Sequence, residues 1–449
     1  MKQYVNLSSE LFADGIFINY NNQEITFSDF YYNVSSKSRI LTNLELLDNT
    51  RIGILLTNQI DIIELYFSCL QLKKIPIILP NDTTNEQLKI ILDKHKIDFI
   101  ITEWTRKKQI HNIEKVNFQY IQELSSSYGG CASTEFDDNI FDIKSVQSMH
   151  LTSGSTGAPK LISLTYENFK SSILQWQEQI NFSKNDSYIQ CLPINHIAGL
   201  SIYLRSQLIG FKTIVLDRFD SNRINYEIDN GANYISLVPS MVKRLINNRS
   251  GRRFPKSFKG MIIGGDSCSQ NLLKDLISFN IPTYIVYGMT ETCSGVCGFW
   301  LNDNIEMSGS VGKPFTQTKI NIKNSHIVIE GPSITPVYSN GKKTKGIYKT
   351  CDIGFFKNKY LFIEGRTDDI IISGGENISK TQIKNILIKN EKIKEVSLEI
   401  LKDDLIGDKI IAYVVVNDNL SEKDIINHCL KYLPKNKLPH EIIIVEEFL

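Results

Sequence analysis

The sequence predicts an α/β fold in two parts. The first is a large N-terminal domain of stacked, mainly parallel sheets with helices and a small barrel-like part, and the second is a small C-terminal α+β domain. Three observations predict this fold: strand-like and helix-like stretches alternate through most of the chain, the texture changes to short strands and polar turns near residue 315, and the last segment carries its own helices and strands.

The alternating region comes first along the chain. Buried strands are expected at 51–58, 73–80 and 98–103, with helices at 59–72 and 84–95 between them. Further strands are expected at 187–193, 212–217, 234–239, 259–265 and 282–288. This strand–helix order favours parallel sheets that are covered by helices on both faces.

The later segments differ in pattern. Residues 319–331 and 354–365 are short strands around polar turns, which indicates an antiparallel, barrel-like piece. A domain boundary is expected between 1–366 and 367–449. The second domain should contain helices at 378–390 and 421–433 and strands at 395–401, 409–416 and 440–449.

Composition limits the function classes. A chain of 449 residues with a formal charge of +1 offers no global attraction to nucleic acid or to an anionic membrane. No stretch approaches the roughly 20 apolar residues of a membrane span. The eight cysteines are widely spaced, without paired metal knuckles, so a reducing cytoplasm is the expected location.

The most informative stretch is 149–160, with the sequence MHLTSGSTGAPK. Glycines let the backbone curl so that several N–H groups face one point, and the hydroxyls and the Lys160 ammonium add donors and charge. This combination suits a polyphosphate. The spacing differs from the GxxxxGK[ST] loop of the common nucleotidases.

This stretch resembles the phosphate-binding signature of the adenylate-forming superfamily, which includes acyl-CoA synthetases and peptide-synthetase adenylation domains. Further blocks follow in the order of that family: LPINHIAG, YGMTETCSG, GSVGKP, TCDIGFF and IEGRTDDIIISGGENIS. The resemblance implies an enzyme that activates a carboxylic acid as an acyl-AMP, with ATP and Mg²⁺ as cofactors and CoA as co-substrate. It also implies the residues that bind ATP or AMP: Thr152, Ser153, Gly154, Ser155, Thr156, Gly157, Gly265, Asp266, Ser267, Tyr287, Gly288, Met289, Asp352 and Arg366.

The catalytic residues that the resemblance implies are Thr290, Glu291, His196 and Lys160. Attack on the α-phosphate builds negative charge there and on the leaving pyrophosphate, so the site needs cations and donors more than a nucleophile. Glu291 is expected to bind the metal, and Thr290 to donate to the α-phosphate.

Two features of the ribose motif bear on its geometry. The acceptor-only carboxylate of Asp352 is suited to hold both ribose hydroxyls, and Arg366 is expected to touch ribose and phosphate. Where the family usually has Gly, this chain has Cys351, and backbone strain is expected there.

Two residues are expected to face the acid. His196 lies at the mouth of the acyl pocket in the family, where orienting the carboxylate is favoured over general-base work, because a carboxylate is already ionised at neutral pH. Within this superfamily, the sequences of 192–219, 235–246, 287–295 and 369–379 most resemble those of the o-succinylbenzoate–CoA ligases of menaquinone biosynthesis. A dicarboxylic substrate would need a cation, for which Arg205 is the candidate, although a surface arginine fits the sequence equally well.

The C-terminal segment carries the expected domain motion. Asp368 matches the hinge of the family, and Gly374 and Gly375 match the turn used in thioester formation, although a plain hairpin turn is the alternative there. The lysine of the family that follows the final strand has no match among residues 441–449. Three explanations stay open: the chain is truncated or frame-shifted, its adenylation is weakened, or another lysine takes that role.

Two other functions stay open at this point. One is a stand-alone adenylation protein that loads a carrier protein, and the other is a nucleotide-binding protein with weakened adenylation. The expected partners are the small-molecule acid, ATP and CoA, with no nucleic acid and no membrane span. The sequence does not decide the oligomeric state, and a homodimer is left open.

Overall fold

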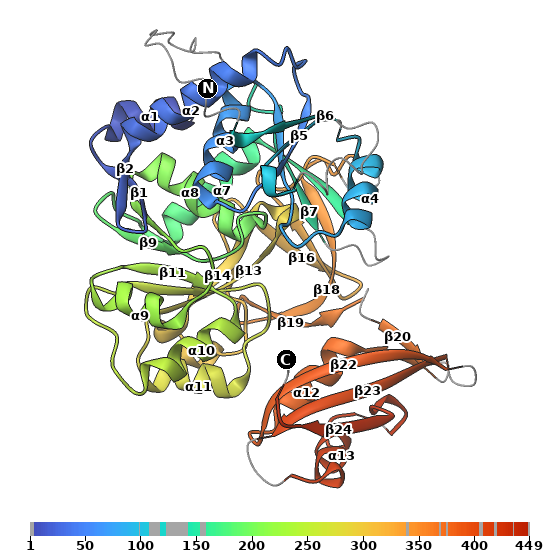
Figure 1. Cartoon of the computed structure of the whole chain (residues 1–449). Helices are drawn as coiled ribbons and strands as arrows, with labels where there is room; N and C mark the ends of the chain where they lie inside the picture. The colour runs from blue at the N-terminus through green and yellow to red at the C-terminus, as the bar shows by residue number, and fades with distance from the viewer. Residues whose placement is uncertain are drawn as a thin grey trace.

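The computed structural model describes residues 4–97, 99–106, 117–122, 142–152, 159–337, 341–367, 370–373, 376–403, 407–416, 420–433 and 435–447. Within them, a large N-terminal part and a small C-terminal part are joined after strand β19 (Figure 1). The predicted α/β fold is confirmed.

The largest sheet has nine strands, in the order β15-β14-β13-β12-β11-β9-β10-β1-β2. Its interior pairs, from β1 to β13, are parallel, and antiparallel strands complete both edges. The bounds are β1 (Ile16–Tyr20), β2 (Gln23–Thr26), β9 (Ser187–Gln190), β10 (Lys212–Val215), β11 (Tyr234–Leu237), β12 (Gly260–Ile263), β13 (Thr283–Met289), β14 (Ser294–Trp300) and β15 (Lys313–Pro314).

A second sheet is fully parallel and has the order β4-β3-β5-β6. Its strands are β3 (Arg51–Leu55), β4 (Ile75–Ile78), β5 (Phe99–Thr102) and β6 (Asn117–Tyr120). The residues of β3, β4 and β5 are almost all buried, as expected for strands that are covered on both faces.

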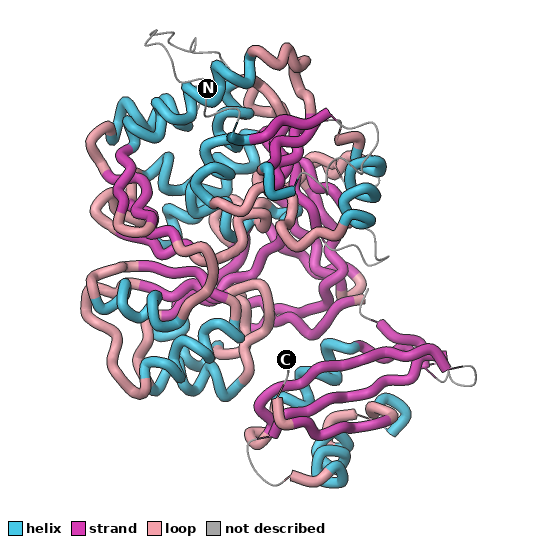
Figure 2. Tube along the Cα trace, in the orientation of Figure 1, coloured by secondary structure: helices cyan, strands magenta, loops and turns pink. Residues whose placement is uncertain are grey.

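Helices cover these sheets (Figure 2). They are α1 (Tyr4–Phe12), α2 (Phe27–Thr42), α3 (Gln59–Gln71), α4 (Asn85–His95), α7 (Tyr166–Ile180), α8 (Ile197–Ile209), α9 (Ser221–Asp229), α10 (Pro239–Arg249) and α11 (Gln270–Ser278). Side-chain caps fix several of their starts. Thr26, Thr84 and Thr165 each close a capping box, which satisfies otherwise unpaired N–H groups in the first turn.

The predicted barrel-like piece is a four-stranded antiparallel sheet in the order β16-β17-β18-β19. Its strands are β16 (Lys319–Lys323), β17 (His326–Glu330), β18 (Ile347–Lys357) and β19 (Tyr360–Arg366). It packs against β14 through a shared apolar cluster that includes Val296, Ile327 and Leu361. This contact brings β18 beside the end of β13.

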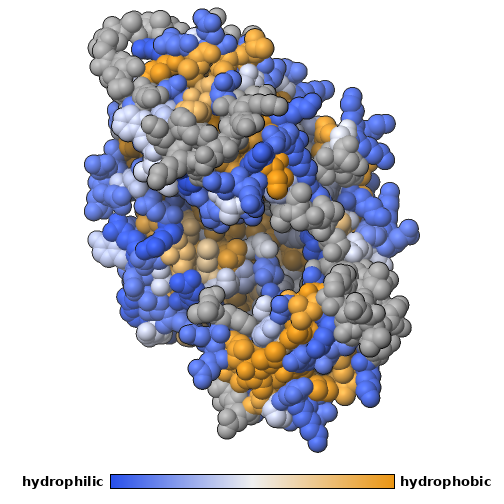
Figure 3. All heavy atoms as spheres, turned by 45° about the vertical axis from the view of Figure 1, so that its right-hand side comes forward, coloured by the Kyte–Doolittle hydropathy of each residue, from blue (hydrophilic) through white to orange (hydrophobic). Residues whose placement is uncertain are grey.

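The small domain has a five-stranded sheet covered by two helices (Figure 1). Its elements are β20 (Ile370–Ser373), β21 (Glu376–Ser379), α12 (Lys380–Ile388), β22 (Ile393–Asp403), β23 (Gly407–Val416), α13 (Glu422–Leu430) and β24 (Glu441–Val445). Its buried core residues lie between Ile383 and Ile442, separate from the clusters of the large domain. In Figure 3 apolar residues gather on this domain, whose large exposed apolar side chains are Leu401, Leu430, Tyr432 and Ile444.

The phosphate-loop segment connects two paired strands. Strand β7 (Val146–Thr152) pairs with β8 (Lys160–Thr165) in an antiparallel ladder, and helix α7 begins only after β8. The loop therefore connects two strands of a hairpin and is not a turn from a strand into a helix. Lys160 is the first residue of β8 and faces Thr152 in the register.

Candidate active site

The core of the candidate site lies where β13 ends beside β18. The chain passes from Met289 into a short 3-10 turn, Thr290–Thr292, and then into β14. Glycine is required in this passage, because a Cβ on Gly288 would meet the Ser294 carbonyl oxygen at 2.1 Å. The Thr292 hydroxyl accepts a hydrogen bond from the Met289 N–H at 2.9 Å, which fixes the turn.

Asp352 is the best-defined of the predicted nucleotide-binding residues. It is 4 % exposed, and Arg366 faces it in the β18–β19 register. The Arg366 guanidinium lies 3.0 Å from Oδ1, and the Tyr287 hydroxyl donates to Oδ2 at 2.5 Å. These two partners hold the carboxylate, which is predicted to bind the ribose, in one orientation.

The Tyr287 hydroxyl is thereby fixed to Asp352, the carboxylate that is predicted to bind the ribose. Burial raises the pKa of its phenol well above the ordinary value, and the adjacent Asp352 charge raises it further. Tyr287 therefore stays protonated and serves as a donor at neutral pH.

The expectation of strain at Cys351 is wrong. Cys351 lies within β18 and is not among the residues with a positive φ, so its backbone does not need the freedom of glycine. Its carbonyl oxygen accepts the Thr367 N–H at 2.7 Å and the Thr367 hydroxyl at 3.0 Å. Its side chain is exposed.

Glu291 is anchored from two directions. Its carbonyl oxygen accepts the Thr335 N–H at 2.8 Å, and its Oε1 accepts the Tyr348 hydroxyl at 3.0 Å. Oε2 makes no hydrogen bond within the described parts of the chain. In those parts no group of three His, Cys, Asp or Glu side chains could hold a metal ion, so a cation at Glu291 would need ligand oxygens from elsewhere, such as phosphates.

The phosphate-loop residues are described only in part. Thr152 and Lys160 flank the loop at the ends of β7 and β8. Ser153, Gly154, Ser155, Thr156 and Gly157 lie outside the described residues, as do Asp368, Gly374 and Gly375. Their predicted roles stay predictions.

The predicted adenine-wall turn lies between the two domains. Gly265 has a φ of +85°, and a Cβ on Gly264 would meet Val286 Cγ1 at 2.8 Å. Asp266 lies 3.9 Å from the Lys384 ammonium, and the Ser267 hydroxyl donates to Asn385 Oδ1 at 3.4 Å. Helix α12 of the small domain thus touches the turn that is predicted to line the adenine.

His196 is the N-cap residue of α8, and its side chain makes no capping hydrogen bond. The ring is exposed on one side, while protein atoms around its other side lower the pKa of the imidazole. Behind it lies His150, which is 4 % exposed and within hydrogen-bonding distance of the Ser148 hydroxyl at 2.9 Å. Burial and, to a smaller extent, the proximity of His196 lower the pKa of His150 to about 3.

Arg205 is not a surface residue. It lies on α8 with 2 % exposure, its guanidinium over the Trp176 ring at 4.8 Å from the centroid. Nε and Nη1 are buried without a hydrogen-bond partner. Among the described residues no carboxylate forms an ion pair with it, which is costly for a buried charge. Burial lowers the pKa of Arg205, although a guanidinium stays charged at neutral pH.

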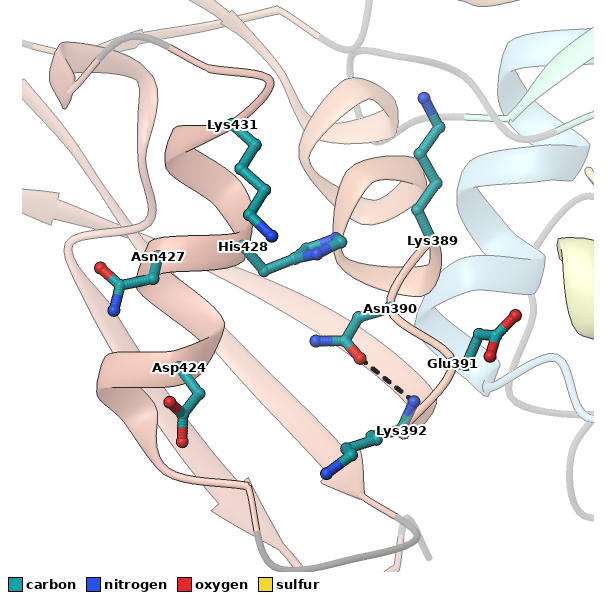
Figure 4. A pocket seen from close by; sticks show the side chains of 8 residues that line it. All are labelled: Lys389, Asn390, Glu391, Lys392, Asp424, Asn427, His428 and Lys431. Atoms are coloured by element: carbon teal, nitrogen blue, oxygen red, sulfur yellow. Dashed lines mark hydrogen bonds between the residues drawn. The ribbon is translucent and has the colours of Figure 1, made fainter.

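A separate hollow lies on the small domain, between the end of α12 and α13 (Figure 4). Its lining includes Lys392, His428 and Lys431, and Figure 4 shows the Lys431 side chain directed toward His428. None of the predicted site residues lines it. The contacts of Asp352 and Glu291, and not this hollow, define the candidate site.

Sequence reasoning missed two residues, Tyr348 and His150. Tyr348 stands four residues before Asp352, as Tyr287 stands four residues before Glu291, and this repeated spacing was the available signal. His150 precedes the phosphate loop by two positions, but nothing in its local pattern indicates that it lies near His196.

The fold is that of a two-domain α/β enzyme in which four of the predicted site residues, Tyr287, Glu291, Asp352 and Arg366, lie around the end of β13 and the adjacent strands β18 and β19. The chain belongs to the AMP-binding enzyme family, which matches residues 8–338. The predicted family resemblance and the prediction of an AMP-binding enzyme are thereby confirmed.

Similar proteins extend the match to nearly the whole chain. A 2-succinylbenzoate–CoA ligase of Oceanobacillus iheyensis is 29 % identical over 95 % of this chain and 92 % of its own. That of Bacillus mycoides is 26 % identical over 97 % and 93 %. The o-succinylbenzoate CoA synthetase of Bacillus subtilis, solved with ATP and magnesium, superimposes with a TM-score of 0.88 at 24 % identity, covering 100 % of this chain and 97 % of that one. The structural match supports the fold assignment.

Proposed function

We propose that this chain is an ATP-dependent, AMP-forming acid–CoA ligase that activates o-succinylbenzoate and transfers the acyl group to CoA. The family and the named relatives support the reaction type. No helix in the described residues has the length and apolar character needed to cross a membrane.

The observation that carries the substrate proposal is the buried guanidinium of Arg205, which has no carboxylate partner among the described residues and whose Nε and Nη1 make no hydrogen bond. A buried cation without a partner is stabilised when an anion of the ligand fills its surroundings. An acid with two carboxylates can present one to ATP and the other to Arg205. The Trp176 ring beside the guanidinium gives an aromatic substrate an apolar surface.

In the first half-reaction, one substrate carboxylate attacks the α-phosphate of ATP and pyrophosphate leaves. Lys160 and Thr290 supply positive charge and a hydrogen bond to the phosphates, and Glu291 holds Mg²⁺, which would neutralise charge on the phosphate oxygens. His196, neutral because its pKa is lowered, orients the carboxylate at the pocket mouth. Asp352, Arg366 and Tyr287 hold the ribose side.

In the second half-reaction, the CoA thiol attacks the acyl carbon and AMP leaves. We propose that residues 367–449 form a mobile domain that turns about Asp368 and brings Gly374 and Gly375 to the thioester site. The separate core of this domain supports an independent unit, since its polar contacts with the large domain are made by surface side chains at the turn of Asp266 and Ser267 and at helices α10 and α11.

A panel of acids tests this proposal. Pyrophosphate release and thioester mass are measured for o-succinylbenzoate, benzoate, succinate and a fatty acid, with and without CoA. We expect o-succinylbenzoate to give the highest kcat/KM and a CoA thioester. Pyrophosphate release without any CoA thioester would favour a carrier-protein acceptor, and ATP binding without pyrophosphate release would favour a nucleotide-binding protein.

A further inference from the structure

Two motifs of the site are joined by a crossed pair of hydrogen bonds. The segment at the end of β13 contains Tyr287 and Glu291, and the segment of β18 contains Tyr348 and Asp352. In each segment the tyrosine hydroxyl donates a hydrogen bond to the carboxylate of the other segment. Tyr287 donates to Asp352 at 2.5 Å, and Tyr348 donates to Glu291 at 3.0 Å.

The spacing makes this crossing geometrically consistent. In both segments the tyrosine precedes the carboxylate by four residues. Val296 of β14 and Ile327 of β17 belong to one apolar cluster, and Tyr287 and Tyr348 pack against its edge. The rings are thus held by packing, so the two hydroxyls have little freedom apart from their carboxylate partners.

The two carboxylate oxygens of Glu291 have different surroundings. Oε1 accepts the phenol, and Oε2 makes no hydrogen bond among the described residues. Glu291 lies on a turn of only three residues, and a free glutamate side chain there would sample several rotamers. A fixed donor on one oxygen selects a rotamer and presents the other oxygen.

We propose that Tyr348 is a positioning residue for the metal: it holds Glu291 in the rotamer that offers Oε2 to the magnesium ion of the nucleotide complex. This inference rests on the proposed function, in which Glu291 is the metal ligand. Hydrogen bonds from neighbouring groups to metal-binding carboxylates orient them, and their loss commonly costs ten- to a hundredfold in metal affinity or activity.

The test uses the full chain with Tyr348→Phe, which keeps the ring and removes only the hydroxyl. The matched control is Tyr413→Phe, because Tyr413 also donates to a carboxylate, Glu399 at 2.7 Å, but on the small domain. Two quantities are measured: the affinity of Mn²⁺ for the enzyme–ATP complex by electron paramagnetic resonance, and the Mg²⁺ dependence of pyrophosphate release.

We expect Tyr348→Phe to weaken Mn²⁺ binding and to raise the Mg²⁺ concentration for half-maximal rate by roughly tenfold, with kcat at saturating Mg²⁺ within about threefold of wild type. Tyr413→Phe should change neither quantity. Equal metal dependence of Tyr348→Phe and wild type would overturn the positioning role.

Glu291→Gln separates this inference from the function on which it rests. If Glu291→Gln loses Mn²⁺ affinity while Tyr348→Phe keeps it, the metal assignment stands and the positioning role fails. If both variants keep wild-type Mn²⁺ affinity, the metal assignment of Glu291 fails and the positioning role fails with it. Thermal unfolding of all three variants shows whether any change reflects a lost fold.

Discussion

The charged side chains on the two sides of the candidate site, the predicted nucleotide side and the predicted acid side, differ in whether they have a partner. On the nucleotide side the charged groups already have partners: Asp352 bonds to Tyr287 and Arg366, and Glu291 bonds to Tyr348. On the acid side the guanidinium of Arg205 is buried without any counter-ion among the described residues. The first region is hydrogen-bonded without a ligand, whereas under the proposed function the second would gain its counter-ion only from the substrate.

Under the proposed function, the first region would stabilise the reacting nucleotide and the second would select the acid. A preorganised set of donors and carboxylates can stabilise charge in the transition state without rearrangement, and it serves the same ATP in every turnover. An unpaired buried cation instead lowers the stability of the free protein and favours substrates that bring an anion to it.

The largest effect is expected on the nucleotide side. Glu291→Gln should reduce the rate of adenylation by about 10²–10³, the scale seen when one charge-stabilising group of an active site is removed. The fold should be unchanged, because the bond from Thr335 is made to the main-chain oxygen of residue 291 and a glutamine oxygen can still accept the Tyr348 hydroxyl. Pyrophosphate release at limiting and saturating Mg²⁺ measures this, and an unchanged rate at limiting Mg²⁺ would contradict the role.

On the acid side, Arg205→Met should act in two opposite directions. The KM for the diacid should rise by roughly 30-fold, corresponding to about 2 kcal/mol for a lost buried charge contact. The free energy of unfolding without substrate should rise by about 1 kcal/mol, because the buried unpaired charge is gone. Steady-state kinetics and denaturant unfolding check both, with a monocarboxylic analogue as the control substrate. A loss of stability would show that Arg205 has a structural partner.

A third expected effect concerns His150 and the pH dependence of stability. Its folded-state pKa is lowered to about 3, whereas an unfolded histidine has a pKa near 6.5. As pH falls below about 6.5, the unfolded chain binds a proton that the folded protein does not bind, so stability falls by up to about 1.4 kcal/mol per pH unit.

The variant His150→Gln keeps a polar partner for Ser148 but does not titrate. Urea unfolding at pH 7, 6 and 5 should therefore give a shallower decline for the variant than for the wild type. Parallel declines would show that His150 is protonated in the folded state.

The smallest expected effect is at Cys351. Since its backbone does not need a positive φ, Cys351→Gly should change the KM for ATP by less than about threefold. It should lower the free energy of unfolding by about 0.5–1 kcal/mol, the usual effect of glycine inside a strand. A large gain in ATP affinity would mean that the cysteine distorts the ribose site.

Much of the fold could be predicted from the sequence, because hydrophobic periodicity reports burial directly. The buried strands at Ile52–Leu55 and Ile75–Ile78 and helix α12 follow from such patterns. The strand β8 between the phosphate loop and α7 was missed, although Leu161, Ile162 and Leu164 are apolar, because six residues are too few for a periodic pattern to separate a strand from the loop motif before it.

The site was predicted motif by motif, but its pairings were not. Local motifs identified Asp352 and Glu291 because their chemistry is visible in a few residues. The crossed tyrosine contacts and the burial of Arg205 depend on how distant elements pack. Local sequence motifs do not show how β18 packs beside β13, and they do not show how deeply α8 is buried.

We expect this protein to form the acyl-adenylate of a diacid in a first half-reaction that does not require CoA. Exchange of labelled pyrophosphate into ATP, measured with o-succinylbenzoate and without CoA, tests it most directly. The account predicts exchange that depends on the diacid and on Mg²⁺ and is much weaker with benzoate. Equal exchange with benzoate, or none with any acid while ATP still binds, would contradict it.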